Sequence, residues 1–239
     1  MEAIIKTDRL TRTFGDFTAV NAISFEVKPG EIFGFLGANG AGKTTALKML
    51  TGLLTPSSGK AWVAGFEVGA QPEQVKRSIG YMSQRFSLYE DLTVRENIRF
   101  FGGIYGLSRV RIREKMEEVI ANLQLDTQAD QLVRALPLGW RQKLSFAVAQ
   151  LHEPPVVFLD EPTSGVDPVT RRQFWEGIYE AAGRGVTLMV TTHYMDEAEY
   201  CHRISMMVEG KIQALDTPRR LKQQFEAQNM DEVFRKLAR

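Results

Sequence analysis

A glycine-rich loop carries the strongest chemical signal in the chain. It runs from Gly37 to Thr44 and fits the pattern G-x-x-x-x-G-K-[ST], between an apolar run and a segment with helical spacing. Glycines let the backbone curl so that successive N–H groups point at phosphate oxygens, and the N-terminus of a following helix favours negative charge. In this pattern Lys43 reaches the β- and γ-phosphates, and the Thr44 hydroxyl ligates Mg²⁺.

We therefore predict that this loop binds a nucleoside triphosphate. The alternative is a glycine-rich turn without a ligand, but the pattern arises by chance in only about 1% of chains of this length. The residues expected to surround the nucleotide are Gly37, Asn39, Gly40, Ala41, Gly42, Lys43, Thr44 and Thr45.

Two adjacent acidic residues form the second chemical signal. Asp160 and Glu161 end the apolar run Val156–Leu159. A buried strand of this kind can deliver Asp160 beside the phosphate loop, where its carboxylate would hold Mg²⁺. Glu161, one residue further on, can polarise a water placed in line with the γ-phosphate. An acidic turn at the end of a buried strand is the alternative, and the phosphate loop upstream favours the catalytic interpretation.

Two more polar residues follow short apolar runs. His193 follows Val186–Thr191, where it can donate a hydrogen bond to a γ-phosphate, and Gln84 follows Ile79–Met82. Neither residue predicts a function alone, because a histidine or glutamine at a strand end is usually structural or merely exposed.

The elements that must position these residues begin with strands. Residues 20–36 read as strand, turn and strand around Pro29-Gly30, and the phosphate loop opens a helix that ends near residues 52–56. Short strand-like pieces follow at residues 61–63 and 79–82.

The middle of the chain, about residues 88–150, changes to helical spacing. Thr93 and Glu96 form a capping-box pattern that opens the first of these helices. Strand–helix alternation resumes at residue 154, and the last 23 or so residues read as a helix or a loosely held tail. The pattern predicts an α/β core interrupted by a helical insertion.

Composition limits the classes of protein. The chain has 239 residues, of which 44% are hydrophobic and 25% charged, as in ordinary globular proteins. A net charge of +1 gives no reason to expect nucleic acid as a partner. No apolar run reaches the length of about 20 residues that a spanning helix needs. A single cysteine, Cys201, and an N-terminus without a secretory signal indicate a soluble cytoplasmic protein that would meet a membrane only through a partner.

Five motifs in order resemble the nucleotide-binding cassette of ABC ATPases: the phosphate loop, Gln84, Asp160-Glu161, Ser164–Asp167 and His193. The resemblance covers about residues 4–220. It implies an α/β P-loop NTPase fold with a RecA-like core, an antiparallel β subdomain and an inserted helical subdomain. The cassette would span residues 1–225, with the helical subdomain at about 88–150 and a C-terminal tail, a candidate truncated segment, at 226–239.

The resemblance also implies roles for single residues, with ATP and Mg²⁺ as cofactors. Gln84 would contact Mg²⁺ or the attacking water at the junction with a transmembrane permease, and His193 would be the switch histidine. Asp167 would lie at the seam between two cassettes. Phe14 would stack on adenine. The alternative interpretation of Phe14 is a core aromatic residue. Phe17 is a weaker candidate for stacking on adenine.

The sequence departs from the family at the signature Leu-Ser-Gly-Gly-Gln, which faces the γ-phosphate bound by the partner cassette. The aligned stretch is Leu136–Trp140, and Pro137 stands where the serine would be. A hydroxyl and one backbone N–H are therefore absent, although Leu138 and Gly139 still offer the N-terminus of a helix. Losing one donor to a transition-state charge costs about 2.7–4 kcal/mol in other enzymes.

Within the family, the stretches Ser87–Val94 and His193–Glu199 look like the ATPase subunits of bacterial ABC-2-type exporters. More narrowly, the chain resembles the second cassette of tandem-cassette exporter ATPases, where Leu-Pro-Leu-Gly replaces the usual signature. A homodimer would carry the Pro137 defect at both sites. We therefore favour an asymmetric pair with a cassette of intact signature, and the chain is a candidate piece of a longer tandem protein.

The leading hypothesis is an ATPase in which ATP closes two cassettes and hydrolysis releases them. This motion would drive a separate permease, with the chain peripheral on the cytoplasmic face of the membrane. One alternative is a soluble ribosome-associated ABC ATPase, since the segment between the phosphate loop and the acidic pair is too short for the coiled coil of chromosome-type members. The other is a cassette that binds ATP with impaired turnover because of Pro137.

Overall fold

The computed structural model describes residues 2–84 and 88–237. Ser87, at the start of one stretch that carries the resemblance, lies outside the described residues. The strands are β1 (Ile5–Phe14), β2 (Phe17–Val27), β3 (Ile32–Leu36), β4 (Ser58–Val63), β5 (Phe66–Glu67), β6 (Ile79–Met82), β7 (Val156–Asp160), β8 (Thr187–Thr192), β9 (Arg203–Val208) and β10 (Lys211–Asp216). The helices are α1 (Lys43–Leu50), α2 (Pro72–Ser78), α3 (Val94–Ile104), α4 (Arg109–Asn122), α5 (Leu138–Ala149), α6 (Pro168–Gly183), α7 (Pro218–Gln224) and α8 (Met230–Leu237), with 3₁₀ segments η1 (Val133–Ala135) and η2 (Met195–Tyr200).

A six-stranded sheet forms the core and confirms the predicted α/β class. Its order is β10-β9-β3-β8-β7-β6, and every pairing except that of β10 is parallel. Strands β3, β7 and β8 are buried along their whole length, as their unbroken apolar runs predict. In register, Leu36 lies opposite Thr192 and Asp160 opposite Thr191. The carboxyl ends of neighbouring strands therefore meet at one edge.

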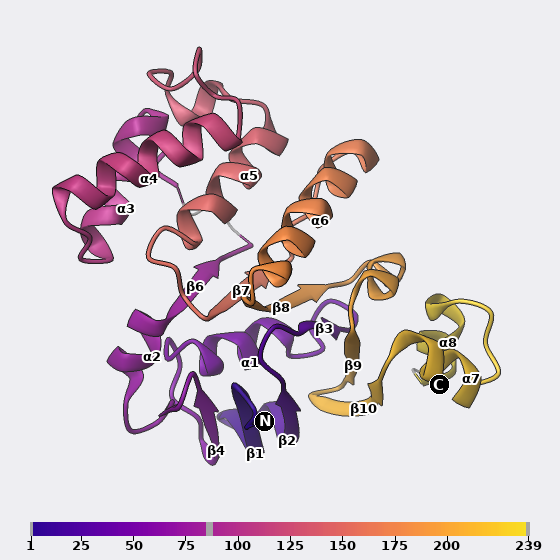
Figure 1. Ribbon diagram of the computed structural model, residues 1–239. Coiled ribbons are helices and arrows are strands. Elements are labelled where there is room, and N and C mark those ends of the chain that lie inside the picture. The colour runs from indigo at the N-terminus through magenta and orange to yellow at the C-terminus, as the bar shows by residue number, and fades with distance from the viewer. Residues whose placement is uncertain (1, 85–87, 238–239) are drawn as a thin grey trace.

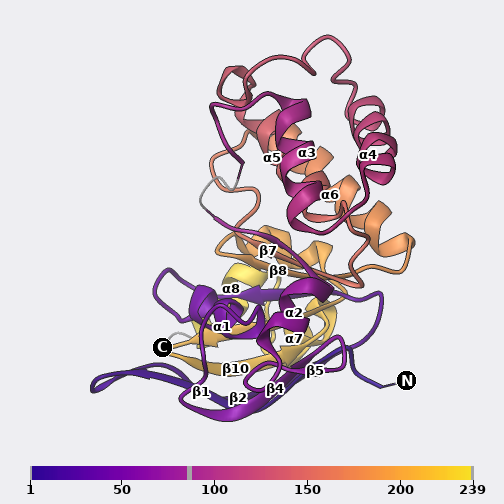
Figure 2. The same cartoon turned by 90° about the vertical axis from the view of Figure 1, so that its left-hand side faces the viewer.

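A second, antiparallel sheet has the order β2-β1-β4-β5. Helix α1 lies between the two sheets (Figures 1 and 2). Its buried face, which includes Leu47 and Leu50, shares one hydrophobic cluster with Val20 and Val63 of the antiparallel sheet and with Phe158 of β7. This packing fixes the helix that follows the phosphate loop.

Strand β1 and helix α2 are among the elements that the sequence analysis did not predict. Strand β1 contains a bulge, because register shifts separate its pairs at Thr7 and Leu10, and Arg9 between them has a left-handed φ of 47°. The bulge breaks the alternation of apolar and polar residues that reveals a strand. Helix α2 buries only Val75, too little apolar surface to show a helical period.

Three helices, α3, α4 and α5, interrupt the sheet between β6 and β7 and pack around a hydrophobic cluster that includes Ile98, Met116 and Leu144. Helices α3 and α4 stand apart from both sheets (Figures 1 and 2), whereas α5 also packs Phe146 and Ala149 into the cluster of the parallel sheet. The predicted capping box is confirmed. The Thr93 hydroxyl accepts from the backbone N–H of Glu96 at 3.2 Å, and Glu96 Oε2 accepts from that of Thr93 at 2.8 Å.

The C-terminal part is helical and packed. In Figure 1 helices α7 and α8 (yellow) lie beside β10. Met230 and Val233 of α8 are buried in the same cluster as Met195 and Ala198 of η2, which follows His193. None of the helices in the described part of the chain combines the length and the apolar character that crossing a bilayer requires.

Candidate active site

Four strand ends bring the predicted residues to one edge of the parallel sheet. The phosphate loop leaves β3, His193 follows β8, and Asp160-Glu161 closes β7. Gln84 follows β6, the neighbour of β7. Because ligands of open α/β sheets bind outside the carboxyl ends of the strands, this convergence marks the candidate site.

The phosphate loop bends sharply where it enters α1. Gly42 caps the helix with φ 102°, in the left-handed region. A Cβ atom there would lie 2.3 Å from the carbonyl oxygen of Ala19, so only glycine fits. No side chain caps the helix start. The N-terminus of α1 is therefore available to an anionic group.

Lys43, the first residue of α1, is almost fully buried. Its Nζ donates to the carbonyl oxygens of Gly37 at 2.8 Å and Ala38 at 3.1 Å, and it lies 3.6 Å from Glu161 Oε1. Burial lowers the pKa of the Lys43 ammonium, against the opposing pull of Glu161 and Asp160. The weak solvation strengthens the interaction of this charge with a phosphate.

Asp160 lies beside the loop helix, as predicted. It accepts from the Thr191 hydroxyl at 2.6 Å and from the Thr44 hydroxyl at 3.3 Å. Its side chain is buried, and this burial raises the pKa of the carboxyl group. Hydroxyl and carboxylate oxygens at this spacing are hard donors of the kind Mg²⁺ prefers.

Glu161 has the most constrained carboxylate of the site. Oε2 accepts from Gln84 Nε2 at 2.9 Å and from His193 Nδ1 at 3.0 Å, while Oε1 faces Lys43. Its backbone has φ 48°, which is uncommon for a side chain of this size and often marks functional sites. The carboxylate therefore lies among two hydrogen-bond donors and a cation.

A hydroxyl that the sequence analysis missed links the two acids. The buried Thr191 of β8 donates to Asp160, and its Oγ1 also accepts from the backbone N–H of Glu161 at 3.0 Å. The Thr191 carbonyl oxygen accepts from the same N–H at 3.1 Å. The only sequence signal was a pair of threonines ending an apolar strand just before His193.

A cleft of about 450 Å³ opens over these groups. It is lined by Phe17, Ala19, Asn39, Gly40, Gly42, Lys43, Thr44, Thr45, Gln84 and Glu161. Phe17 therefore lines the cleft and Phe14 does not, although they face each other across the β1–β2 turn. Phe14 is half-exposed, and the Arg12 guanidinium lies 4.6 Å from its ring centroid.

Leu138 and Gly139 lie away from this cleft, in the first turn of α5 behind Pro137. The first hydrogen bond of that helix runs from Arg141 N to the Pro137 carbonyl oxygen at 3.1 Å. A Cβ atom on Gly139 would lie 2.4 Å from the Thr170 methyl carbon, so this glycine allows α5 to approach α6.

Asp167 begins α6 next to this helix start. Its side chain accepts from the backbone N–H groups of Val169 and Thr170, both at 3.0 Å. The Gly139–Thr170 approach thus places the start of α5 beside the segment that contains Asp167.

The geometry agrees with the comparisons to known proteins. A family model described as "ABC transporter" matches residues 20–164. The chain belongs to this family. Nod factor export ATP-binding protein I of Paraburkholderia xenovorans is 38% identical over 91% of the chain and 72% of that protein. Linearmycin resistance ATP-binding protein LnrL of Bacillus subtilis is 34% identical over 90% of the chain and 69% of that protein.

The probable multidrug ABC transporter ATP-binding protein YbhF of Escherichia coli is 50% identical over 93% of the chain. The chain spans only 39% of the length of that relative. Among solved structures, an ATP binding subunit of an ABC transporter aligns with a TM-score of 0.87 at 26% identity, over 98% of this chain and 99% of that one. CbiO1 of Clostridium perfringens aligns with a TM-score of 0.83, also at 26% identity, over 99% and 95%.

The hydroxyl of Thr191 should matter for turnover. We expect Thr191→Val to lower kcat for ATP about 10- to 100-fold, because displacement of reacting groups by about 1 Å costs up to that factor. Thr191→Ser keeps the hydroxyl and should stay within a few-fold of wild type. Steady-state ATPase kinetics check this, and equal activity of the valine and serine variants would contradict it.

The Asp160 carboxylate should reduce the stability of the folded chain at high pH. Burial raises its pKa in the folded state, so the native chain holds this proton more tightly than the unfolded chain does. The charged Asp160 carboxylate lowers the free energy of unfolding by its full amount above the pKa of the folded state. This loss of stability disappears as pH falls below the ordinary pKa of the unfolded chain. We expect nucleotide-free Asp160→Asn to melt above wild type at pH 8, with a gap that shrinks towards pH 4. The exposed Asp126→Asn serves as control, and a gap that does not change with pH would contradict the assignment.

Proposed function

We propose that the chain is the ATP-hydrolysing cassette of an ABC-2-type exporter, which pairs with a second cassette and drives a separate permease. The observation that carries this proposal is the Glu161 carboxylate, held by Gln84, His193 and Lys43 on the wall of a cleft formed over a phosphate loop. A carboxylate so placed can orient a water towards the γ-phosphate.

The phosphates of ATP would lie against the loop and the N-terminus of α1, with Lys43 turned towards them. Thr44, Asp160 and Gln84 would hold Mg²⁺, which supplies charge neutralisation on the phosphates when bound. Glu161 would accept a proton from the attacking water. His193, already donating to that carboxylate, can donate to a γ-phosphate oxygen as charge develops.

The adenine would stack on an aromatic residue at the mouth of the cleft. Family resemblance assigns this role to Phe14, and the cleft lining favours Phe17. The two side chains lie on paired strands, with 47% and 65% of their surfaces exposed. Both rings are therefore accessible to a base.

A second cassette would complete the site. Leu138 and Gly139 would present backbone N–H groups to ATP bound by the partner, and Asp167 would lie at the seam. Pro137 removes the signature hydroxyl, so a like pair would have two weakened sites. A partner with an intact signature would form one normal site with this chain's Lys43. The length of the Escherichia coli relative leaves room for such a partner within one polypeptide.

The permease would bind the helical insertion near Gln84. Tyr89, Phe100 and Ile104 are exposed there to 52%, 40% and 62%, and the Tyr89 and Phe100 rings meet edge to face at 4.8 Å. Such gathered apolar side chains are typical of protein interfaces. The chain would thus lie at the membrane surface through its permease.

The named relatives favour export over a ribosomal role, since their names specify multidrug transport, Nod factor export and linearmycin resistance. Pro137 is the feature that would favour a cassette with impaired turnover. The contacts of Glu161 with Lys43 and His193 favour hydrolysis instead.

The test is Mg²⁺-dependent ATP hydrolysis across a series of chain concentrations, with Lys43→Ala as the background. We expect weak turnover that rises with the square of concentration, and Pro137→Ser should raise it about tenfold or more by restoring a donor. A Pro137→Ser chain with unchanged homodimer turnover would contradict the asymmetric pairing. Absence of hydrolysis with every partner cassette and permease would contradict the function itself.

A further inference from the structure

A buried hydrogen bond joins the two segments that carry the catalytic groups. Thr163 lies two residues after Glu161, and Glu197 lies four residues after His193. The Thr163 hydroxyl donates to Glu197 Oε1 at 2.5 Å. Glu197 is fully buried and Thr163 nearly so. This bond lies outside the cleft. It joins the same two segments as the contact between Glu161 and His193 does.

An arginine of α6 meets the same carboxylate. Arg171 Nε lies 3.8 Å from Glu197 Oε1, and its guanidinium lies 4.2 Å from the ring centroid of Tyr194. The Tyr194 ring in turn lies 4.1 Å from that of His193. The backbone N–H of Arg171 donates to the carbonyl oxygen of Asp167 at 2.9 Å. Arg171 thus connects the start of α6 to the residues around the histidine.

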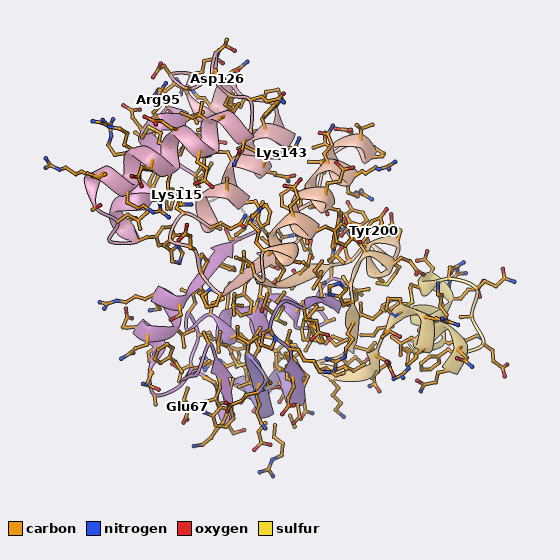
Figure 3. The ribbon with its side chains drawn as sticks, in the orientation of Figure 1. Glu67, Arg95, Lys115, Asp126, Lys143 and Tyr200 are labelled. Carbon is orange, nitrogen blue, oxygen red and sulfur yellow. The ribbon has the colours of Figure 1, made fainter. Side chains whose placement is uncertain are left out.

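The far end of η2 is also attached to α6. The Tyr179 hydroxyl donates to the Tyr200 carbonyl oxygen at 3.0 Å, and the Trp175 and Tyr200 rings lie 5.2 Å apart. Figure 3 shows Tyr200 beside α6, on the side of the C-terminal helices. Since both ends of η2 contact α6, the position of Glu197 relative to that helix is fixed.

The carboxylate at 197 is costly for stability. Burying a charged group requires hydrogen bonds and a counter-charge, and apolar residues of similar volume often serve the fold as well or better. The Glu197 carboxylate meets Thr163 and Arg171 through Oε1, while its buried Oε2 has no hydrogen-bond partner among the described residues. Thr163 belongs to the segment after Glu161, and Arg171 to the helix behind Asp167. These partners indicate that Glu197 serves the candidate active site rather than the stability of the fold.

We infer that Glu197 is a positioning residue for hydrolysis. By accepting the hydrogen bond from Thr163, with the Arg171 guanidinium as a counter-charge 3.8 Å away, it sets the distance between the segment after Glu161 and the segment after His193. It thereby maintains the 3.0 Å contact between Glu161 and His193. It touches no reacting atom. The ion pair between Glu197 and Arg171, with the backbone hydrogen bond from Arg171 to Asp167, connects this network to Asp167, so a displacement of Asp167 would be transmitted to Glu161 and His193. The kinetic consequence rests on the proposed ATPase function, whereas the geometric consequence does not.

The test compares Thr163→Val with Thr163→Ser. In crystals of the nucleotide-free chain, we expect the valine variant to lengthen the His193 Nδ1–Glu161 Oε2 distance beyond the hydrogen-bond limit of about 3.5 Å, and the serine variant to preserve the bond. In ATPase assays, the valine variant should lose about 10- to 100-fold in kcat with an unchanged KM, because the phosphate loop is untouched. Glu197→Gln, which retains an acceptor, should lie closer to wild type than Glu197→Ala.

A Thr163→Val chain that keeps the 3.0 Å contact would overturn the inference, whatever its turnover. So would a serine variant that fails to preserve the contact. If wild type hydrolyses no ATP with any partner, the proposed function fails, and the crystallographic comparison still decides the role of Glu197.

Discussion

The parallel pairing of β8 with β3 on one side and β7 on the other determines where the phosphate loop, the two acids and His193 lie. Leu36 opposite Thr192 and Asp160 opposite Thr191 put the phosphate loop, His193 and Glu161 at one level of the sheet. Each strand needs only to be apolar along its length and polar at its end. The sheet then gathers the polar ends without any long-range recognition among them, which is why binding sites recur at this edge of α/β sheets.

The same gathering places charges where water is scarce. Lys43 and Glu161 are both buried and lie 3.6 Å apart, and burial shifts the pKa of Lys43 down and that of Asp160 up. Such a site works against the stability of the folded chain, as functional sites commonly do. In return its charges are fixed before a phosphate arrives, and they act on it through a medium of low dielectric constant.

Local patterns made much of this predictable. Each predicted site segment lies at the end of an apolar strand, namely the phosphate loop, the two acids and His193. The order of these motifs along the chain indicated the family. Thr191 and Glu197 were not predictable, because their partners depend on which strand lies centrally and on how η2 folds back. Strand β1 was missed because its bulge at Arg9 breaks the alternation that sequence patterns rely on.

In the mechanism that we propose, the Glu161 carboxylate, which contacts Gln84, His193 and Lys43, is the general base for hydrolysis of bound ATP. Glu161→Gln keeps the size of the side chain and removes its basicity. Equilibrium binding and turnover of ATP by this variant beside wild type are the most direct measurement. We predict affinity for ATP within a few-fold of wild type and a loss of turnover of about 10²- to 10⁴-fold, the range of a lost general base. Turnover near the wild-type rate would contradict the account.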